Sequence, residues 1–123
     1  MDIIVVDNSA AVDENLQSVL SDIPEIRVVG HSMNAQDAIE QIDALLPDAV
    51  ILDLLLQSGS GMDVLENIKK RHAWIKVMVL THYSEKFYLE RCKRAGVDCF
   101  LDKSFQFMQL HDVLEEWVHP GHP

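Results

Sequence analysis

The chain has 123 residues, of which 48% are hydrophobic and 24% charged, and its formal net charge is −10. This length and apolar content suit one domain with a buried core and exclude global disorder. No apolar run approaches the roughly 20 residues that a membrane-spanning helix needs. No basic region precedes the first apolar run, and a strongly acidic domain binds DNA and anionic lipid poorly. We therefore expect a cytoplasmic domain that contacts neither nucleic acid nor membrane directly.

Apolar runs alternate with helical patterns in the first half of the chain. A β-branched run opens the sequence and predicts a buried strand, and the later segments are told apart by their apolar spacing. Pro24 and Pro47 each follow a helical pattern and mark where it ends. The predicted elements are a strand at 3–6, a helix at 12–23, a strand at 26–30, a helix at 35–46 and a strand at 49–52.

The same alternation continues in the second half. A loop with glycines separates it from the first half, and Gly96 is placed to cap the C-terminus of a helix. The predicted elements are a helix at 62–68, a strand at 77–80, a helix at 87–95, a strand at 99–101 and a helix at 107–117. The last residues, 119–123, are rich in proline and glycine, so they are predicted to form a flexible tail or the start of a linker.

Five strand–helix units in succession predict an α/β fold. Strands that are apolar on both faces, joined by helical crossovers, form a parallel sheet with helices on both faces. In a doubly wound sheet of this kind, ligands bind beyond the carboxyl ends of the strands. The residues that follow each apolar run are therefore the candidates for a functional site.

Polar residues follow four of the five predicted strands. Asp7 and Asn8 follow the first, Asp53 follows the third, Thr81 ends the fourth and Lys103 comes just after the fifth. Together they suit phosphoryl transfer to a carboxylate. An aspartate can act as the nucleophile, a hard cation bound by oxygen atoms offsets the phosphate charge, and a lysine pairs with a phosphoryl oxygen.

Three segments of the chain resemble a known family. Residues 47–54, 61–65 and 95–104, with the acidic pair after the first strand, are similar to the motifs of response-regulator receiver domains, in order and at the right separations. The resemblance covers residues 2–118. It implies a flavodoxin-like doubly wound (βα)5 fold with strand order 2-1-3-4-5, and a receiver domain at 1–118.

The resemblance implies a role for each polar position. Asp53 would be the phospho-acceptor, with Lys103 and Thr81 holding the phosphoryl group. Mg²⁺ would be bound by Asp7, Asn8, Asp53 and the backbone carbonyl of Leu55. The implied switch residues are Thr81, which moves inward on phosphorylation, and Phe100, which changes rotamer. Leu55 and Tyr83 would tune dephosphorylation.

The resemblance also implies partners. A sensor histidine kinase or a phosphotransfer protein would supply the phosphoryl group, and the surface of the fourth helix, fifth strand and fifth helix would change and support a homodimer. The domain would be a switch and not an enzyme, apart from self-catalysed phosphotransfer and slow autodephosphorylation. No output domain can be inferred from these residues.

Three positions depart from the family pattern. Asn8 replaces an aspartate that usually contacts Mg²⁺, so weaker cation binding is expected. Gln57 and Ser104 replace prolines, which gives the loop after Asp53 more freedom and leaves the peptide isomer at Lys103–Ser104 open. Asn8 motivates the alternative of a degenerate receiver that binds a partner without phosphorylation. A flavin-binding domain on the same fold is disfavoured because the Asp7 carboxylate would repel a phosphate.

Five further residues are predicted to be structural. Cys92 and Cys99 are too few for a metal site and are expected to be reduced, partly buried thiols. Trp74 and Trp117 are expected to pack against the core. His82, beside Thr81, is expected to be an ordinary polar loop residue.

Overall fold

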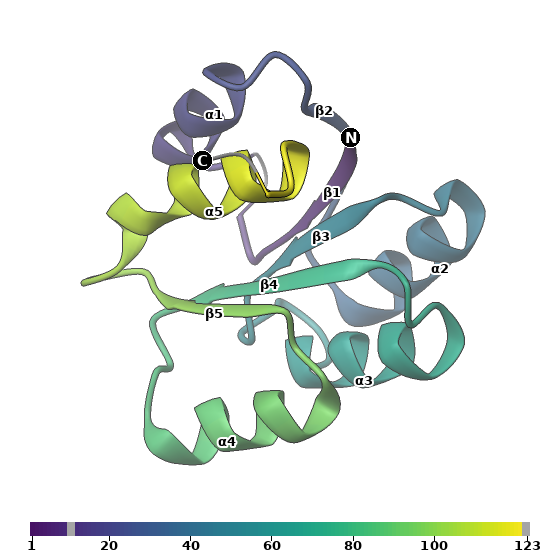
Figure 1. Ribbon diagram of the computed structural model, residues 1–123. Coiled ribbons are helices and arrows are strands. Elements are labelled where there is room, and N and C mark those ends of the chain that lie inside the picture. Colours follow the sequence, from purple (N-terminus) through teal and green to yellow (C-terminus); the bar gives the residue numbers. More distant parts are fainter. Residues whose placement is uncertain (10–11, 122–123) are drawn as a thin grey trace.

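The computed structural model describes residues 1–9 and 12–121, so the last two residues of the predicted tail at 119–123 lie outside the described residues. Strands and helices alternate along the chain (Figure 1). The strands are β1 (Asp2–Val6), β2 (Arg27–Ser32), β3 (Ala49–Leu52), β4 (Lys76–Thr81) and β5 (Cys99–Asp102). The helices are α1 (Glu14–Ser21), α2 (Ala35–Leu45), α3 (Gly61–Arg71), α4 (Lys86–Ala95), the short 3₁₀ helix η1 (Phe107–Gln109) and α5 (Leu110–Val118).

The five strands form one parallel sheet in the order β2-β1-β3-β4-β5. Helices α1 and α5 cover one face, and α2, α3 and α4 cover the other (Figure 1). The predicted doubly wound (βα)5 fold and strand order are confirmed. Because β1 and β3 are neighbours in the centre, their carboxyl ends, which carry Asp7 and Asp53, lie side by side.

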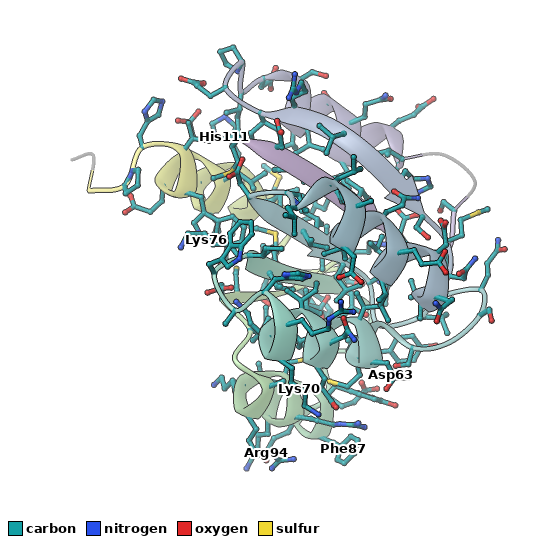
Figure 2. The ribbon with its side chains drawn as sticks, turned by 90° about the vertical axis from the view of Figure 1, so that its right-hand side faces the viewer. Asp63, Lys70, Lys76, Phe87, Arg94 and His111 are labelled. Carbon is teal, nitrogen blue, oxygen red and sulfur yellow. The ribbon has the colours of Figure 1, made fainter. Side chains whose placement is uncertain are left out.

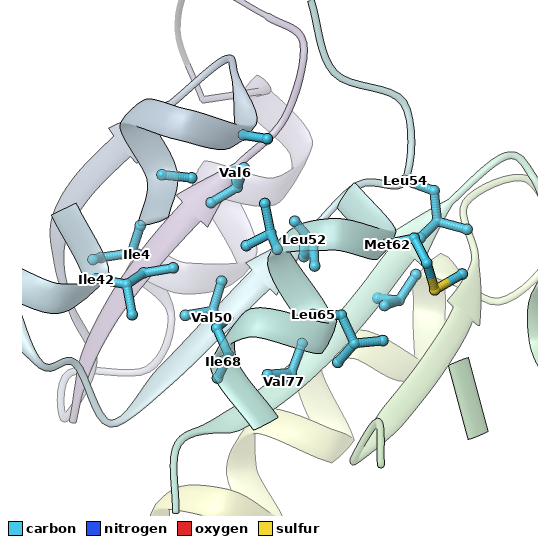
Figure 3. Close-up of a cluster of buried hydrophobic side chains, with 14 of the residues drawn as sticks. Ile4, Val6, Ile42, Val50, Leu52, Leu54, Met62, Leu65, Ile68 and Val77 are labelled. Carbon is cyan, nitrogen blue, oxygen red and sulfur yellow. The ribbon is translucent and has the colours of Figure 1, made fainter. Parts of the chain in front are cut away.

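Each helix is charged outside and apolar inside. Asp63 and Lys70 on α3 and Arg94 on α4 lie on the outer surface (Figure 2). On the inner side, residues such as Leu65 and Ile68 pack against Val77 and the neighbouring strands (Figure 3). This burial of apolar side chains provides the main stabilisation of the fold.

Alternate residues of β1, β3, β4 and β5 enter two separate cores. In β1, Ile4 and Val6 face α2 and α3, whereas Ile3 and Val5 face α1 and α5. Each of these four side chains is at most 1% exposed. A strand buried on both faces has no polar position along its buried length, so polar side chains begin only at Asp7, where the strand ends.

Both cysteines are free thiols. Cys92 is fully buried between α4 and α3, with its Sγ 4.0 Å from the Sδ of Met62. Burial raises the pKa of the Cys92 thiol to about 11 and also raises that of Cys99. Both thiols are free, as predicted; Cys99 is partly buried as expected, whereas Cys92 is fully buried.

Some boundaries differ from the predictions. Strand β2 continues to Ser32, two residues beyond the predicted end, and the fifth helix opens with the 3₁₀ turn η1. The prediction for Trp74 is wrong: its exposed fraction is 58%, and in the same connection between α3 and β4 it is the neighbouring Ile75, at 0%, that enters the core. Among the described residues, no helix is both long and apolar enough to cross a membrane.

Candidate functional site at the carboxyl edge of the sheet

Asp53 is held at the carboxyl end of β3. Its backbone N–H donates to the carbonyl oxygen of Val6 at 2.8 Å, which continues the pairing of β1 and β3. Gly61, the first residue of α3, packs beneath it so closely that a Cβ there would overlap the Asp53 carbonyl oxygen. Glycine is therefore required at this position. Asp53 is 6% exposed, which keeps its carboxylate at the floor of the site.

Three donors converge on the Asp53 carboxylate. The Thr81 hydroxyl donates to Oδ1 at 2.9 Å, and the Leu55 backbone N–H donates to the same oxygen at 3.2 Å. Lys103 Nζ donates to Oδ2 at 3.0 Å. The structure therefore brings Asp53, Thr81 and Lys103 together, although they are separated along the chain by up to 50 residues. Hydrogen bonds from a charged donor are stronger than neutral ones, so the lysine also fixes the carboxylate.

Asp7 and Asn8 lie beside Asp53 and differ from each other. The Asp7 side chain is buried, with 6% of the residue exposed, whereas Asn8 is exposed. The Asn8 backbone carbonyl accepts a hydrogen bond from Gln57 Nε2 at 3.2 Å. Gln57, predicted to loosen the loop after Asp53, thus links that loop to the one after β1.

The carboxyl edge carries an excess of negative charge. Asp7, Asp53 and Asp102 are each 6% exposed, and Lys103 forms an ion pair with Asp53. Hydrogen bonds from Ser84 and from the backbone N–H groups of Ser104 and Phe105 hold the pKa of Asp102 below its ordinary value. Such an edge attracts cations.

A cavity of about 350 Å³ opens onto these groups. Its polar lining residues are Asp7, Asp13, Asn15, Asp53, His82 and Lys103. His82 Nδ1 lies 3.0 Å from the Ser104 hydroxyl, so this loop histidine has a partner in the β5–η1 connection. The cavity gives a small anion or a hydrated cation access to Asp53.

Oxygen atoms dominate this site, which fits a hard cation. Within the described residues, no three histidine, cysteine, aspartate or glutamate side chains form a metal-binding group. Two buried carboxylates with water to complete the shell suit Mg²⁺, which usually retains several of its waters. The predicted ligand Leu55 has an exposed side chain, and its backbone lies at the site because its N–H binds Asp53.

Of the two predicted switch residues, Thr81 contacts the Asp53 carboxylate and Phe100 lies in the core against β4. Thr81 is fully buried and already hydrogen-bonds Asp53, and Phe100 is half-buried against the core under α4. The Tyr83 backbone N–H donates to the Thr81 hydroxyl at 3.1 Å, and its ring packs edge-on against Tyr88 with centroids 5.9 Å apart. Thr81 thus connects Asp53 to the start of α4.

One partner of the site is not among the predicted residues. His31 on β2 places its Nε2 2.9 Å from Asp7 Oδ1. The contact depends on the pairing of β2 with β1, in which His31 lies opposite Val5. The signal available in the sequence is a polar residue near the end of a strand predicted to neighbour β1. The prediction misses it because it ends this strand at residue 30.

The peptide bond between Lys103 and Ser104 is trans, as are all peptide bonds of the described residues. This answers the question left open by Ser104. Its backbone N–H donates to Asp102 Oδ1 at 2.7 Å, a bond that a proline could not make.

Comparison with known proteins agrees with this architecture. The family model of the response regulator receiver domain matches residues 3–115. The response regulator protein VraR of Staphylococcus saprophyticus is 35% identical over 114 residues, which cover 93% of this chain and 54% of that protein. This chain therefore spans about half the length of the curated relatives it matches.

Solved structures show the same fold. The receiver domain of RcsB from Salmonella enterica serovar Typhimurium, determined with the phosphomimetic BeF3⁻, superposes with a TM-score of 0.87 at 20% identity over 98% of this chain and 89% of that one. The Mn²⁺-bound form of response regulator Rcp1 superposes with a TM-score of 0.83 at 22% identity, over 98% of this chain and 96% of that one.

The doubly wound (βα)5 sheet of this chain is the fold that these solved response regulator structures share. The chain belongs to the response regulator receiver domain family.

Proposed function

We propose that this receiver domain is switched by phosphorylation of Asp53. The observation that carries the proposal is the convergence of Thr81 and Lys103 on one buried carboxylate that faces an open cavity. A carboxylate held by a hydroxyl and an ammonium group is oriented for attack, and the same two donors can then bind the phosphoryl oxygens.

The transfer is a displacement at phosphorus. The bond between phosphorus and the donor, a phosphohistidine nitrogen or a small acyl phosphate, breaks as a carboxylate oxygen of Asp53 forms its bond to phosphorus. Lys103 then pairs with a phosphoryl oxygen instead of with the carboxylate alone, and Thr81 donates its hydroxyl to another. Hydrolysis later releases inorganic phosphate and restores the Asp53 carboxylate.

Asp7 and Asp53, with the carbonyl of Leu55, are the groups that would hold Mg²⁺, and Asn8 would add a neutral oxygen. When bound, Mg²⁺ offsets the negative charge of the phosphoryl group and of the two carboxylates. A neutral oxygen from Asn8 attracts the cation less than a carboxylate would, so Mg²⁺ affinity is expected to be lower in the wild type than in the Asn8→Asp variant.

Phosphorylation would change the surface formed by α4, β5 and α5, which a partner would recognise. Movement of Thr81 toward a phosphoryl group would pull the adjoining loop and Tyr83, and Phe100 would adjust beneath α4. Helix α4 exposes Phe87, at 62%, and Arg94 (Figure 2), which suits a protein partner or a second receiver. A histidine kinase or phosphotransfer protein as donor, a homodimer through this surface, domain limits of 1–118 and a cytoplasmic location are part of the proposal.

The test is incubation of the purified domain with acetyl phosphate and Mg²⁺, followed by intact mass measurement. We expect a phosphoryl adduct on the wild type, none on Asp53→Asn, and an adduct on Asp98→Asn, the matched substitution at the opposite edge of the sheet. An adduct that persists in Asp53→Asn would overturn the assignment of the acceptor.

The exposed, neutral Asn8 favours one alternative, a degenerate receiver that binds its partner without phosphorylation. The same experiment across Mg²⁺ concentrations separates the two functions. Absence of an adduct at every concentration, with an adduct restored by Asn8→Asp, would support the alternative.

A further inference from the structure

His31 makes a buried contact with the predicted cation ligand Asp7. Its Nε2 lies 2.9 Å from Asp7 Oδ1, and the exposed fractions of the two side chains are 21% and 8%. Strand pairing fixes the approach, since His31 lies opposite Val5 and the Asp7 backbone N–H donates to the carbonyl oxygen of Ser32 at 3.0 Å. Strand pairing therefore places the His31 backbone where its side chain can reach the Asp7 carboxylate.

The direction of this hydrogen bond is set by chemistry. An ionised carboxylate has no proton to give, so the imidazole donates through Nε2–H. The Ser9 backbone N–H donates to the same oxygen, Oδ1, at 3.0 Å. None of the described residues donates to Oδ2. Two donors thus hold one oxygen of Asp7 and leave the other for a cation.

The neutral residue at position 8 increases the importance of the Asp7 carboxylate for cation binding. Asn8 is exposed, and its backbone carbonyl is bound by Gln57 Nε2. The site therefore depends on Asp7 and Asp53 for its charged oxygens. Where few ligands carry the charge, the orientation of each one has a larger effect on affinity.

We propose that His31 is a positioning residue for Asp7 that sets the Mg²⁺ affinity of the site. The inference rests on the proposed function. His31 acts through Asp7 and does not touch the cation. Its N–H holds the carboxylate in one rotamer before the cation arrives, so that binding does not have to order it. Loss of such an outer hydrogen bond typically costs about 10-fold or more in metal affinity.

Two substitutions of equal length test the role of the donor. His31→Gln keeps an N–H group at a similar distance along the side chain, whereas His31→Met fills the space without a donor. MgCl₂ is titrated into each protein at fixed pH and ionic strength, and the dissociation constant is read from amide chemical shifts. We expect about tenfold weaker binding in His31→Met and near wild-type binding in His31→Gln. Thermal unfolding in EDTA checks that both variants fold.

The same pair is made in an Asn8→Asp background, where tighter binding keeps the measurement within range. Equal Mg²⁺ affinity for His31→Met and His31→Gln in both backgrounds would overturn the inference. The absence of Mg²⁺ binding in both backgrounds would also overturn it.

The acetyl phosphate reaction separates this inference from the proposed function. If both hold, His31→Met needs more Mg²⁺ to form the adduct but reaches the wild-type plateau, because Asp53, Thr81 and Lys103 are intact. If the wild type binds Mg²⁺ in a His31-dependent way but forms no adduct, the proposed function fails and the inference stands. If His31→Met and His31→Gln form the adduct with identical Mg²⁺ dependence, the proposed function stands and the inference fails.

Discussion

Two lysine–carboxylate pairs lie at opposite edges of the sheet. At the amino edge, Lys69 Nζ donates to Asp98 Oδ2 at 2.8 Å and to the carbonyl oxygens of Ile75 and Ala73 at 2.7 and 3.3 Å. An ammonium group has three protons, so all of them are used. Asp98 also accepts the Val77 backbone N–H at 2.7 Å. This pair is closed and ties α3 to the starts of β4 and β5.

The pair at the carboxyl edge is open. Asp53 Oδ2, at 3.0 Å, is the one acceptor that the described residues offer to Lys103 Nζ. Two protons remain for another acceptor, and the pair faces a cavity of about 350 Å³. The bond lengths of the two pairs are similar, so distance alone does not separate a structural pair from a functional one. Spare donors, access and unbalanced charge do.

The largest effect on stability is expected at the closed pair. Asp98→Asn removes the charge that balances Lys69, whose side chain is only 14% exposed, and should lower the free energy of unfolding by about 2 kcal/mol. The melting temperature should then fall by about 8 °C. Thermal unfolding measures the change, and the acetyl phosphate adduct should still form. An unchanged melting temperature would contradict the structural role given to this pair.

The same substitution at the open pair should raise the free energy of unfolding instead of lowering it. Asp53→Asn removes one of three crowded carboxylates, while the amide oxygen can still accept from Thr81 or Lys103. We expect a gain of about 1 kcal/mol at neutral pH, since functional sites commonly reduce stability. Denaturant unfolding measures it. A loss as large as that of Asp98→Asn would mean that the two pairs are equivalent.

Mg²⁺ should sharpen the difference. A cation that binds only the folded state, present at about three times its dissociation constant, adds about 0.8 kcal/mol to stability. We expect this gain in the wild type and in Asp98→Asn, and a smaller one in Asp53→Asn. Melting curves with MgCl₂, against NaCl at equal ionic strength, check it. Equal gains in all three proteins would show that the cation binds elsewhere.

The smallest expected effect is on the pH dependence of stability in acid, through Asp102. The native pKa of Asp102 lies below its ordinary value of 3.8, chiefly because of the hydrogen bond from Ser84. The unfolded chain therefore binds more protons in this range, so the contribution of Asp102 is fully present above its ordinary pKa and is lost as pH falls through the lowered one. Asp102→Asn should make stability less dependent on pH below about 5. Unfolding curves measured from about pH 6 to about pH 3 test this.

The sequence predicts the central strands well because their apolar residues are continuous. β1, β3 and β4 are buried on both faces, so composition alone identifies them. The edge strand β2 is less regular: Val28 is 41% exposed, and its register with β1 shifts between Ile3 and Ile4. Its last residues, His31 and Ser32, are polar and carry no strand signal of their own.

The residues of the candidate site also divide into those that the sequence predicts and those that it does not. Asp7, Asp53, Thr81 and Lys103 are predictable because each follows or ends an apolar run, and parallel pairing brings strand ends together. His31 is not, because its partner depends on the register of an edge strand. The spare donors of Lys103 and the full set of partners around the amino-edge lysine also depend on three-dimensional contacts that no local pattern encodes.

The low reactivity of the two natural thiols has a practical consequence for testing the proposed switch in solution. With burial raising the pKa of Cys92 to about 11 and also that of Cys99, little thiolate forms at neutral pH, and only the thiolate reacts readily with a maleimide. The exposed Phe105 and Met108, at 86% and 88%, lie shortly after Lys103. A cysteine placed at either position would label first in the otherwise native chain, so a fluorophore can be attached near the proposed phosphorylation site without removing either natural thiol.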